Sequence, residues 1–279
     1  MRSASRWIYV AVGCVVLLFS GLVYAWSVLS GPIAAEFPRW TTAQLSLTFT
    51  IVMSFFCLGG LTCGALSARI SPRIFLWISA LLFLVGFLLT ASMRSLPMLY
   101  VGFGVVCGLA SGFSYNAVLG TVGAWFPDKQ GLVSGILLMG FGFGAMILGM
   151  VASTMIASMG WRATFKVLAI ALGVIILIGA FVIRPASDAF VQQLTQGGGK
   201  AKPAVEELNT AGMLARRNFW LFFLWAIIIS AAGLIVINTS TPYAEQFVGA
   251  SAAAGVAGIV SIANGGGRVI FGGLFDKIG

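Results

Sequence analysis

One arginine lies inside an apolar run, where a charge is costly. Arg268 is the only charged residue between Ala250 and Phe275. A guanidinium buried in such a run is strongly unfavourable unless something compensates it, so a functional role is the default interpretation. Its planar fork of N–H donors matches a carboxylate, which indicates an anion site. The alternative is a structural anchor, because Asp276 follows only eight residues later and the side chain could extend toward an aqueous surface.

Four further side chains carry polar groups inside apolar runs and need hydrogen-bond partners there. They are Tyr24, Trp26, Tyr115 and Asn116. We interpret them as candidate wall residues of a cavity that also holds Arg268. Two alternatives stay open: interhelical hydrogen bonds for the tyrosines, and a packing or interfacial role for Trp26.

Charged residues at the ends of the apolar runs form a second candidate set. Arg69, Arg73 and Asp128 could hold neighbouring helices together in one conformational state and release them in another. Marking of membrane topology would explain the arginines equally well.

The remaining residue types argue against catalysis. The chain has no His, and its seven acidic residues all lie at the ends of apolar runs or between them. No nucleophile, base and orienting group occur together, so we predict that the protein is not an enzyme. The four cysteines show no CxxC spacing, and the sequence predicts neither a metal site nor a cofactor. The glycines from Gly140 to Gly144 follow no strand and are interpreted as helix packing.

The elements that must hold these residues are apolar runs of membrane-spanning length. Hydrophobic residues make up 59% of the chain and charged residues 8%, whereas soluble domains carry about a quarter charged residues. The runs are about 20 residues long, enough to cross roughly 30 Å of hydrocarbon. The sequence therefore predicts an all-α membrane protein with about eight transmembrane helices. Their expected ranges are 7–29, 45–66, 74–92, 97–120, 131–156, 163–183, 219–239 and 250–275.

The basic residues predict the orientation of the chain. Placing the N-terminus in the cytoplasm puts eleven of the sixteen Lys and Arg residues on the cytoplasmic side and four on the other, with Arg268 inside a span. This distribution explains the net charge of +9 by membrane topology, and we predict no nucleic-acid partner.

One long polar stretch, residues 184–218, divides the chain unequally. We interpret it as a cytoplasmic linker between an N-terminal half of six spans, residues 1–183, and the start of a second half, residues 219–279, with spans seven and eight. The end of span eight repeats the end of span two, since Gly272 and Lys277 correspond to Gly64 and Arg69. A parallel repeat of six spans is typical of carriers with a site near the membrane midplane. Only two of the six spans expected in the second half are present, so the sequence is interpreted either as a fragment or as a natural truncation that has lost the last four.

The two repeated segments carry a short pattern of Gly, three residues, Asp, a base, one residue and Gly. The second copy fits it completely, with Gly272, Asp276, Lys277 and Gly279. The first copy departs from it at two positions, with Ala68 in place of the acid and Ser71 in place of the last Gly. This pattern resembles the cytoplasmic signature of the major facilitator superfamily, and the resemblance implies a fold of six plus six helices.

Longer stretches make the resemblance more specific. They are the runs 24–32, 45–51, 125–135 and 264–268, of which Trp125-Phe-Pro-Asp-Lys129 and Arg268 are the most distinctive. Together they resemble the oxalate/formate antiporter family, a relative of the monocarboxylate carriers. The resemblance implies alternating access, a small carboxylate substrate bound by Arg268, and aromatic side chains around it, for which Tyr24 and Tyr115 match best.

The functional prediction is therefore a multi-pass carrier of the cell's inner membrane that exchanges small carboxylates, and we expect a monomer. One alternative is proton-linked monocarboxylate transport, although no intramembrane carboxylate or His relay is present in this sequence. Another is a membrane sensor, derived from a carrier, that binds the anion without moving it.

Overall fold

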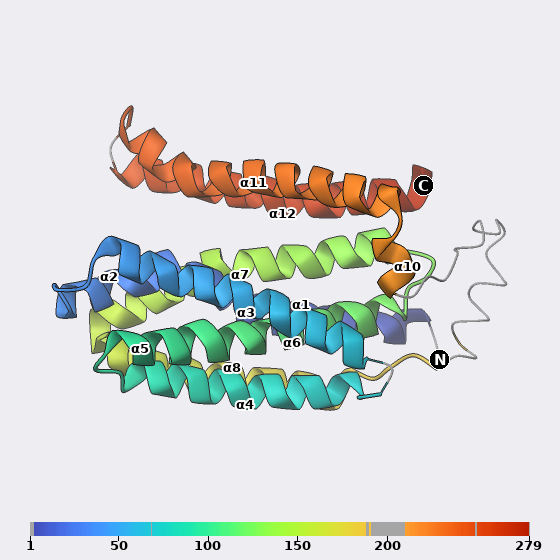
Figure 1. Cartoon of the computed structure of the whole chain (residues 1–279), viewed down its shortest axis with the longest axis horizontal. Coiled ribbons are helices and arrows are strands. Elements are labelled where there is room, and N and C mark those ends of the chain that lie inside the picture. Colours follow the sequence, from blue (N-terminus) through green and yellow to red (C-terminus); the bar gives the residue numbers. More distant parts are fainter. Residues whose placement is uncertain (1–2, 68, 188–189, 191–209, 249, 279) are drawn as a thin grey trace. The chain divides into compact units, whose positions relative to one another are not determined.

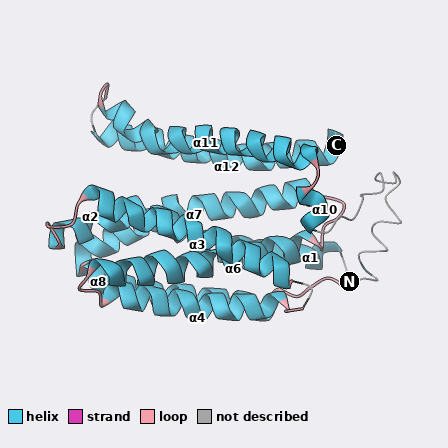
Figure 2. Ribbon diagram, viewed as in Figure 1, coloured by secondary structure: helices cyan, strands magenta, loops and turns pink. Residues whose placement is uncertain are grey.

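The computed structural model describes residues 3–67, 69–187, 190, 210–248 and 250–278. Within these ranges the chain forms helices joined by turns, and no strand is found among them (Figure 2). The helices are α1 Ser3–Ser20, η1 Gly21–Ala25, α2 Trp26–Glu36, α3 Thr42–Leu66, α4 Pro72–Ala91, α5 Leu96–Leu99, η2 Tyr100–Cys107, α6 Gly108–Gly123, α7 Gln130–Met159, α8 Trp161–Val182, α10 Thr210–Leu214, α11 Arg217–Glu245 and α12 Ala250–Ile278. The prediction of an all-α protein is confirmed.

Six of the expected spans coincide with continuous helical segments that are long and apolar enough to cross a membrane. Among the described residues these are Arg6–Glu36, Thr42–Leu66, Pro72–Ala91, Leu96–Gly123, Gln130–Met159 and Trp161–Val182. The seventh and eighth expected spans coincide with α11 and α12, which are 29 residues long each. That these last two cross the membrane stays a prediction.

The chain divides into two compact units. The first contains Met1–Thr195 together with Asn264–Gly279, and the second contains Gln196–Ala263. In the first unit the long helices run side by side (Figure 1), with α1 packed on α7 and α6, α3 on α6, and α4 on α8 and α6. Most of the predicted linker lies outside the described residues, so the predicted division at residues 184–218 stays untested.

In the second unit, aromatic side chains near the start of α11 contact one another and α10. Trp220 near the start of α11 donates from its indole nitrogen to the carbonyl oxygen of Leu214 at 2.8 Å, which ties α11 to the short helix α10. The rings of Phe219 and Trp220 both lie 5.9 Å from the ring of Phe223. These contacts are local and follow from helical spacing.

Two of the spans are not regular α-helices. The first is interrupted by the 3₁₀ turn η1 between α1 and α2, and the fourth contains the π-helical segment η2 between α5 and α6. The first span was expected to end near residue 29, but α2 includes Pro32 and continues to Glu36. Irregular helical turns within membrane spans are often functional sites or hinges, because they redirect side chains.

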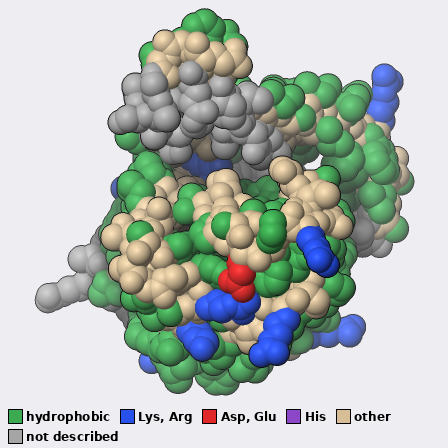
Figure 3. All heavy atoms as spheres, turned by 90° about the vertical axis from the view of Figure 1, so that its left-hand side faces the viewer, with side chains coloured by type: hydrophobic (Ala, Val, Ile, Leu, Met, Phe, Trp, Pro, Cys, Tyr) green, Lys and Arg blue, Asp and Glu red, His purple; other side chains and the backbone are tan. Residues whose placement is uncertain are grey.

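Large apolar side chains cover the outer surface of the first unit. Leu61, Leu81, Ile170 and Phe181 are each at least 59% exposed. Figure 3, which turns the end of the bundle toward the viewer, shows hydrophobic side chains over the flanks and basic side chains around that end. This distribution is unfavourable in water and favourable in lipid, as expected for a multi-pass membrane protein.

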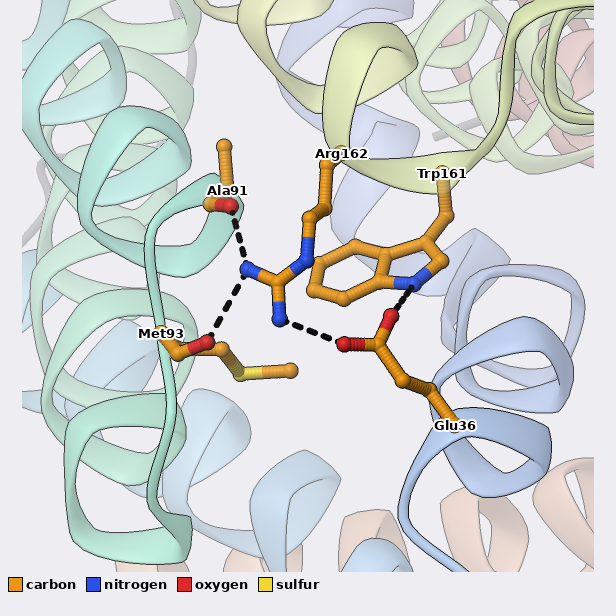
Figure 4. A network of polar contacts seen from close by, with 5 residues as sticks. All are labelled: Glu36, Ala91, Met93, Trp161 and Arg162. Atoms are coloured by element: carbon orange, nitrogen blue, oxygen red, sulfur yellow. Dashed lines mark hydrogen bonds and ion pairs between the residues drawn. The ribbon is translucent and has the colours of Figure 1, made fainter.

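A polar network fixes the end of the bundle where α2, α4 and α8 meet (Figure 4). Arg162 donates to Glu36 at 2.7 Å and to the carbonyl oxygens of Ala91 and Met93 at 2.9 and 3.0 Å. The indole nitrogen of Trp161 donates to the other carboxylate oxygen of Glu36 at 2.6 Å. The guanidinium of Arg162 lies 4.3 Å from the Trp161 ring centroid. One arginine thus joins three helices that are far apart in sequence.

Candidate functional site

An aromatic cluster lies between η1, α3, α6 and α7. The ring of Phe141 lies 5.3 Å from that of Tyr24 and 4.9 Å from that of Tyr115, both edge-on. Phe56 lies 5.2 Å from Tyr115, and Phe49 lies 5.8 Å from Tyr24. These are preferred distances and angles for aromatic pairs, so the five rings form a defined wall. We call these five residues the aromatic wall.

Arg268 on α12 lies beside this wall. Its Nη1 donates to the carbonyl oxygen of Leu138 on α7 at 2.8 Å. The side chain is half-buried and lies close to Gly142, one residue after Phe141. The structure therefore brings together three residues that the sequence had proposed as a site.

The charge of Arg268 is only partly compensated. A guanidinium carries five N–H donors. In the part of the chain that the structure describes, the hydrogen bond to Leu138 is the only one that its side chain makes. The ion pairs found there are Arg6 with Asp128 and Arg162 with Glu36, and neither involves Arg268. Free donors beside an apolar wall can bind an anion without losing an existing carboxylate partner.

The two tyrosine hydroxyls offer additional hydrogen bonds. Among the described residues, neither Tyr24 nor Tyr115 has a hydrogen-bond partner for its hydroxyl, although both rings are largely enclosed. A phenol can donate to a carboxylate oxygen. Arg268 can therefore donate charge-assisted hydrogen bonds from its guanidinium to one small anion, and Tyr24 and Tyr115 can each donate one from a neutral hydroxyl.

Two of the predicted wall residues lie elsewhere. Trp26 is buried, donates from its indole nitrogen to the carbonyl oxygen of Leu45 at 3.0 Å, and its ring lies 4.7 Å from that of Phe103. Asn116 donates to the carbonyl oxygen of Gly112 at 3.0 Å within α6. These contacts correspond to the packing alternative for Trp26 and to an intrahelical hydrogen bond for Asn116.

Asn116 also lines a groove of about 490 Å³ between α3, α4 and α6. Its lining is mainly apolar and includes Cys63, Gly64 and Thr121. None of the residues of the aromatic wall lines this groove, so it is a separate feature of the first unit.

The signature at the end of α12 contacts the start of α7. The carboxylate of Asp276 accepts hydrogen bonds from the backbone amides of Gly131 and Leu132, both at 2.7 Å. These are free N–H groups of the first turn of α7, where the helix dipole also favours a negative charge. Gly131 and Gly272 pack backbone to backbone, and a Cβ on either would meet the other's carbonyl oxygen. This arrangement can hold α7 and α12 together.

Asp128 pairs with the first helix. Both carboxylate oxygens accept from Arg6, at 2.7 and 2.8 Å, and Arg6 also lies 4.5 Å from the ring centroid of Phe126. Partial burial raises the pKa of Asp128, but hydrogen bonds from Arg6 and the positive charges of Arg6 and Lys129 outweigh it, so the pKa lies below its ordinary value. The carboxylate is therefore charged at neutral pH.

The other residues of the predicted gating set are distributed as follows. Arg73 donates from Nε to the carbonyl oxygen of Ile183 at 3.2 Å, which joins the start of α4 to the end of α8. Arg69 and Lys277 are exposed. Gly64 has no neighbouring atom that a Cβ would meet. Gly279 lies outside the described residues.

Sequence reasoning missed several partners in this region. Phe49, Phe56 and Phe141 were not among the candidate site residues, because single phenylalanines in apolar spans carry no distinguishing signal. The glycines around Phe141 were correctly assigned to packing, since Cβ atoms on Gly140 and Gly144 would meet Cys14 and Leu18 of α1. The position of Phe141 between these glycines was the available clue, because close helix approach carries the intervening ring to a fixed place.

Comparison with known proteins gives a family match for almost the whole chain. The family model described as Major Facilitator Superfamily matches residues 6–279.

Individual relatives agree with this match at modest identity. The chain is 28% identical over 285 aligned positions to the oxalate:formate antiporter of Oxalobacter formigenes, covering 99% of this chain and 64% of that protein. It is 26% identical over 277 residues to the uncharacterized MFS-type transporter YhjX of Escherichia coli, covering 98% of this chain and 67% of that protein. It is 25% identical over 218 residues to human monocarboxylate transporter 11, covering 77% of this chain and 44% of that protein. The chain thus spans about two thirds of the length of the first two relatives.

Proposed function

Because this chain belongs to the major facilitator superfamily, we propose that it is a secondary carrier that exchanges small carboxylates by alternating access. Arg268 acts as the counter-charge of the anion, and the hydroxyls of Tyr24 and Tyr115 complete its hydrogen bonds. The names of two relatives, an oxalate:formate antiporter and a monocarboxylate transporter, support the same substrate class.

The observation that carries the proposal is the partly compensated charge of Arg268 within a helix beside aromatic rings. Its guanidinium has one hydrogen bond to a carbonyl oxygen and no carboxylate partner among the described residues. A carboxylate would use the free donors and offset the desolvation of both groups. The rings of the aromatic wall would exclude water and strengthen that interaction.

This arrangement favours exchange over leak. Without an anion the charge of Arg268 stays uncompensated, which raises the free energy of any closed intermediate through which the carrier must pass. A bound carboxylate lowers that barrier, so reorientation occurs mainly with substrate bound. The contact of Asp276 with the first turn of α7 would stabilise one closed side and break when that side opens.

We further propose that the carrier resides in the cell membrane as a monomer with its N-terminus in the cytoplasm. The support for this orientation is the excess of basic residues on one side, eleven against four. Single cysteines introduced at Ser3 and at Arg39, modified by an impermeant thiol reagent in intact cells, would test it. Only the Arg39 position should react from outside.

Exchange in proteoliposomes tests the function. The natural-length gene product is reconstituted in liposomes loaded with unlabelled carboxylate, and uptake of labelled oxalate, formate and lactate is measured. We expect saturable exchange that Arg268→Gln lowers by about a hundredfold, as for loss of a charged hydrogen-bond partner. Arg94→Gln is the matched control, because Arg94 is exposed and makes no side-chain hydrogen bond among the described residues. Absence of exchange, or exchange that is indifferent to Arg268, would contradict the proposal.

A second candidate is uptake of a monocarboxylate without exchange. The similarity to monocarboxylate transporter 11 favours it over unrelated transport functions. Uptake into empty liposomes that depends on a pH gradient would identify this mode, whereas exchange requires loaded vesicles and is indifferent to the gradient.

A further inference from the structure

The break in the first span determines where Tyr24 lies. α1 ends at Ser20, the 3₁₀ turn η1 occupies Gly21–Ala25, and α2 begins at Trp26. Tyr24 is the fourth residue of that turn. A 3₁₀ turn has different side-chain directions from an α-helix, so the direction of the Tyr24 ring depends on this short segment.

Three buried serines surround the start of the turn. Ser111 on α6 donates to the carbonyl oxygen of Ser20 at 3.2 Å. The hydroxyl of Ser114 lies 2.8 Å from the hydroxyl of Ser20, its nearest acceptor, and 3.1 Å from the carbonyl oxygens of Ala110 and Ser111 in its own helix. The hydroxyl of Ser20 donates to the carbonyl oxygen of Val16 at 2.9 Å. All three serines are fully buried. Where helical pairing changes, backbone carbonyls need new donors, and in a membrane no water supplies them.

The same turn packs directly on the aromatic wall. A Cβ on Gly21 would meet the carbonyl oxygen of Phe141, so the backbone of η1 touches the backbone of α7. The ring of Phe141 lies between Tyr24 and Tyr115, at 5.3 and 4.9 Å. The serines, the turn and the wall therefore form one continuous set of contacts.

We propose that Ser20, Ser111 and Ser114 are positioning residues that fix the turn η1 and thereby hold Tyr24 in the aromatic wall beside Arg268. They do not contact the substrate, and they act through Tyr24. The consequence for affinity rests on the proposed carboxylate exchange, whereas the effect on Tyr24 does not.

Ser79 provides a matched control. It is a fully buried serine on α4 whose hydroxyl donates to the carbonyl oxygen of Ala110 on α6 at 2.7 Å. Ser79→Ala therefore removes a buried interhelical hydrogen bond of the same kind, but none at the turn η1. The carbonyl oxygen of Ala110 also lies 3.1 Å from the hydroxyl of Ser114, so this control perturbs the same part of α6 without removing a contact to Ser20. A purely structural role of the three serines would give the same results as this control.

The first measurement does not depend on the substrate. 3-Fluorotyrosine is incorporated at position 24, and its ¹⁹F resonance is recorded in the natural-length protein with Ser111→Ala, Ser114→Ala or Ser79→Ala. We expect a shifted or broadened signal in the first two variants and an unchanged signal in Ser79→Ala. A signal that is unchanged in both Ser111→Ala and Ser114→Ala, or equally changed in Ser79→Ala, would overturn the proposal.

The second measurement is the kinetics of carboxylate exchange. We expect Ser111→Ala and Ser114→Ala to raise KM about fivefold with the maximal rate within twofold, as for a hydrogen bond lost indirectly. Ser79→Ala should leave KM within twofold. An equal rise of KM in all three variants would overturn the role in the site. If the unmodified protein exchanges no carboxylate while the ¹⁹F signals change as expected, the proposed function fails and the positioning of Tyr24 stands.

Discussion

Two arginines of this chain, Arg162 and Arg268, differ in what compensates their charge. Arg162 at the end of the bundle donates to a carboxylate and two carbonyl oxygens and stacks on Trp161. Arg268 donates to one carbonyl oxygen, and no carboxylate among the described residues pairs with it. Both are arginines in helices of a membrane protein, yet only one has its hydrogen-bonding capacity largely used by the protein.

On the proposed function, the difference separates a structural arginine, Arg162, from a binding arginine, Arg268. A side chain whose donors are satisfied by the protein contributes to stability, and its removal leaves its partners unpaired. A charged side chain whose donors stay free gains little from the protein itself, and we propose that a ligand compensates the charge of Arg268. Opposite effects on stability and on transport are therefore expected for the two residues.

The largest expected effect on stability comes from Arg162→Gln. Its loss leaves Glu36 and two carbonyl oxygens without a partner, and we expect about 2 kcal/mol lower stability after allowance for partial exposure. The melting temperature should fall by about 4 to 8 °C while KM is unchanged. Arg268→Gln should leave the melting temperature unchanged or raise it. Equal destabilisation by both substitutions would remove the distinction between the two arginines.

Arg268→Lys sharpens the comparison, because it keeps the positive charge and removes the planar guanidinium that can donate two parallel hydrogen bonds. A lysine provides a point charge without bidentate geometry, so we expect KM for exchange to rise about tenfold, or about 1.4 kcal/mol. Uptake at several substrate concentrations measures this. A Lys variant with unchanged KM would show that charge alone suffices at this position.

The tyrosine hydroxyls should contribute less than the charge. We expect Tyr24→Phe and Tyr115→Phe each to raise KM about threefold to fivefold, as for a neutral hydrogen bond of about 1 kcal/mol. Tyr100→Phe is the matched control, because the hydroxyl of Tyr100 donates to the carbonyl oxygen of Gln44 at 2.9 Å, outside the wall. KM values that respond equally in all three variants would argue against a direct role of Tyr24 and Tyr115.

The smallest expected effect concerns the pair of Arg6 and Asp128. Because the pKa of Asp128 is lowered in the folded protein, the pair stabilises the fold above the ordinary pKa of about 4. That contribution, roughly 0.5 kcal/mol for a partly exposed pair, is lost as the pH falls through the lowered pKa. Melting temperatures between pH 3 and pH 7 measure it. Arg6→Gln should remove this part of the pH dependence, and a pH dependence that persists in Arg6→Gln would assign it to other carboxyl groups.

Sequence reasoning located much of the candidate site, because burial of charge in an apolar span is a local property. Arg268, Tyr24 and Tyr115 were all identified from residue type and position within a span. Trp26 and Asn116 met the same criterion and lie outside the aromatic wall. A polar group in a span needs a partner, but the sequence does not say whether that partner is a backbone carbonyl or a ligand.

The sequence by itself determined the all-α membrane fold and the position of six spans, because hydrocarbon requires a continuous apolar helix and hydropathy records it residue by residue. Only the tertiary structure decided which residues the charged side chains bind. Asp128 pairs with Arg6 across 122 residues, and Asp276 caps α7 from 144 and 145 residues away. Such contacts depend on which helix faces pack together, and in lipid, where hydrophobic drive between helices is absent, close packing and interhelical hydrogen bonds make that choice.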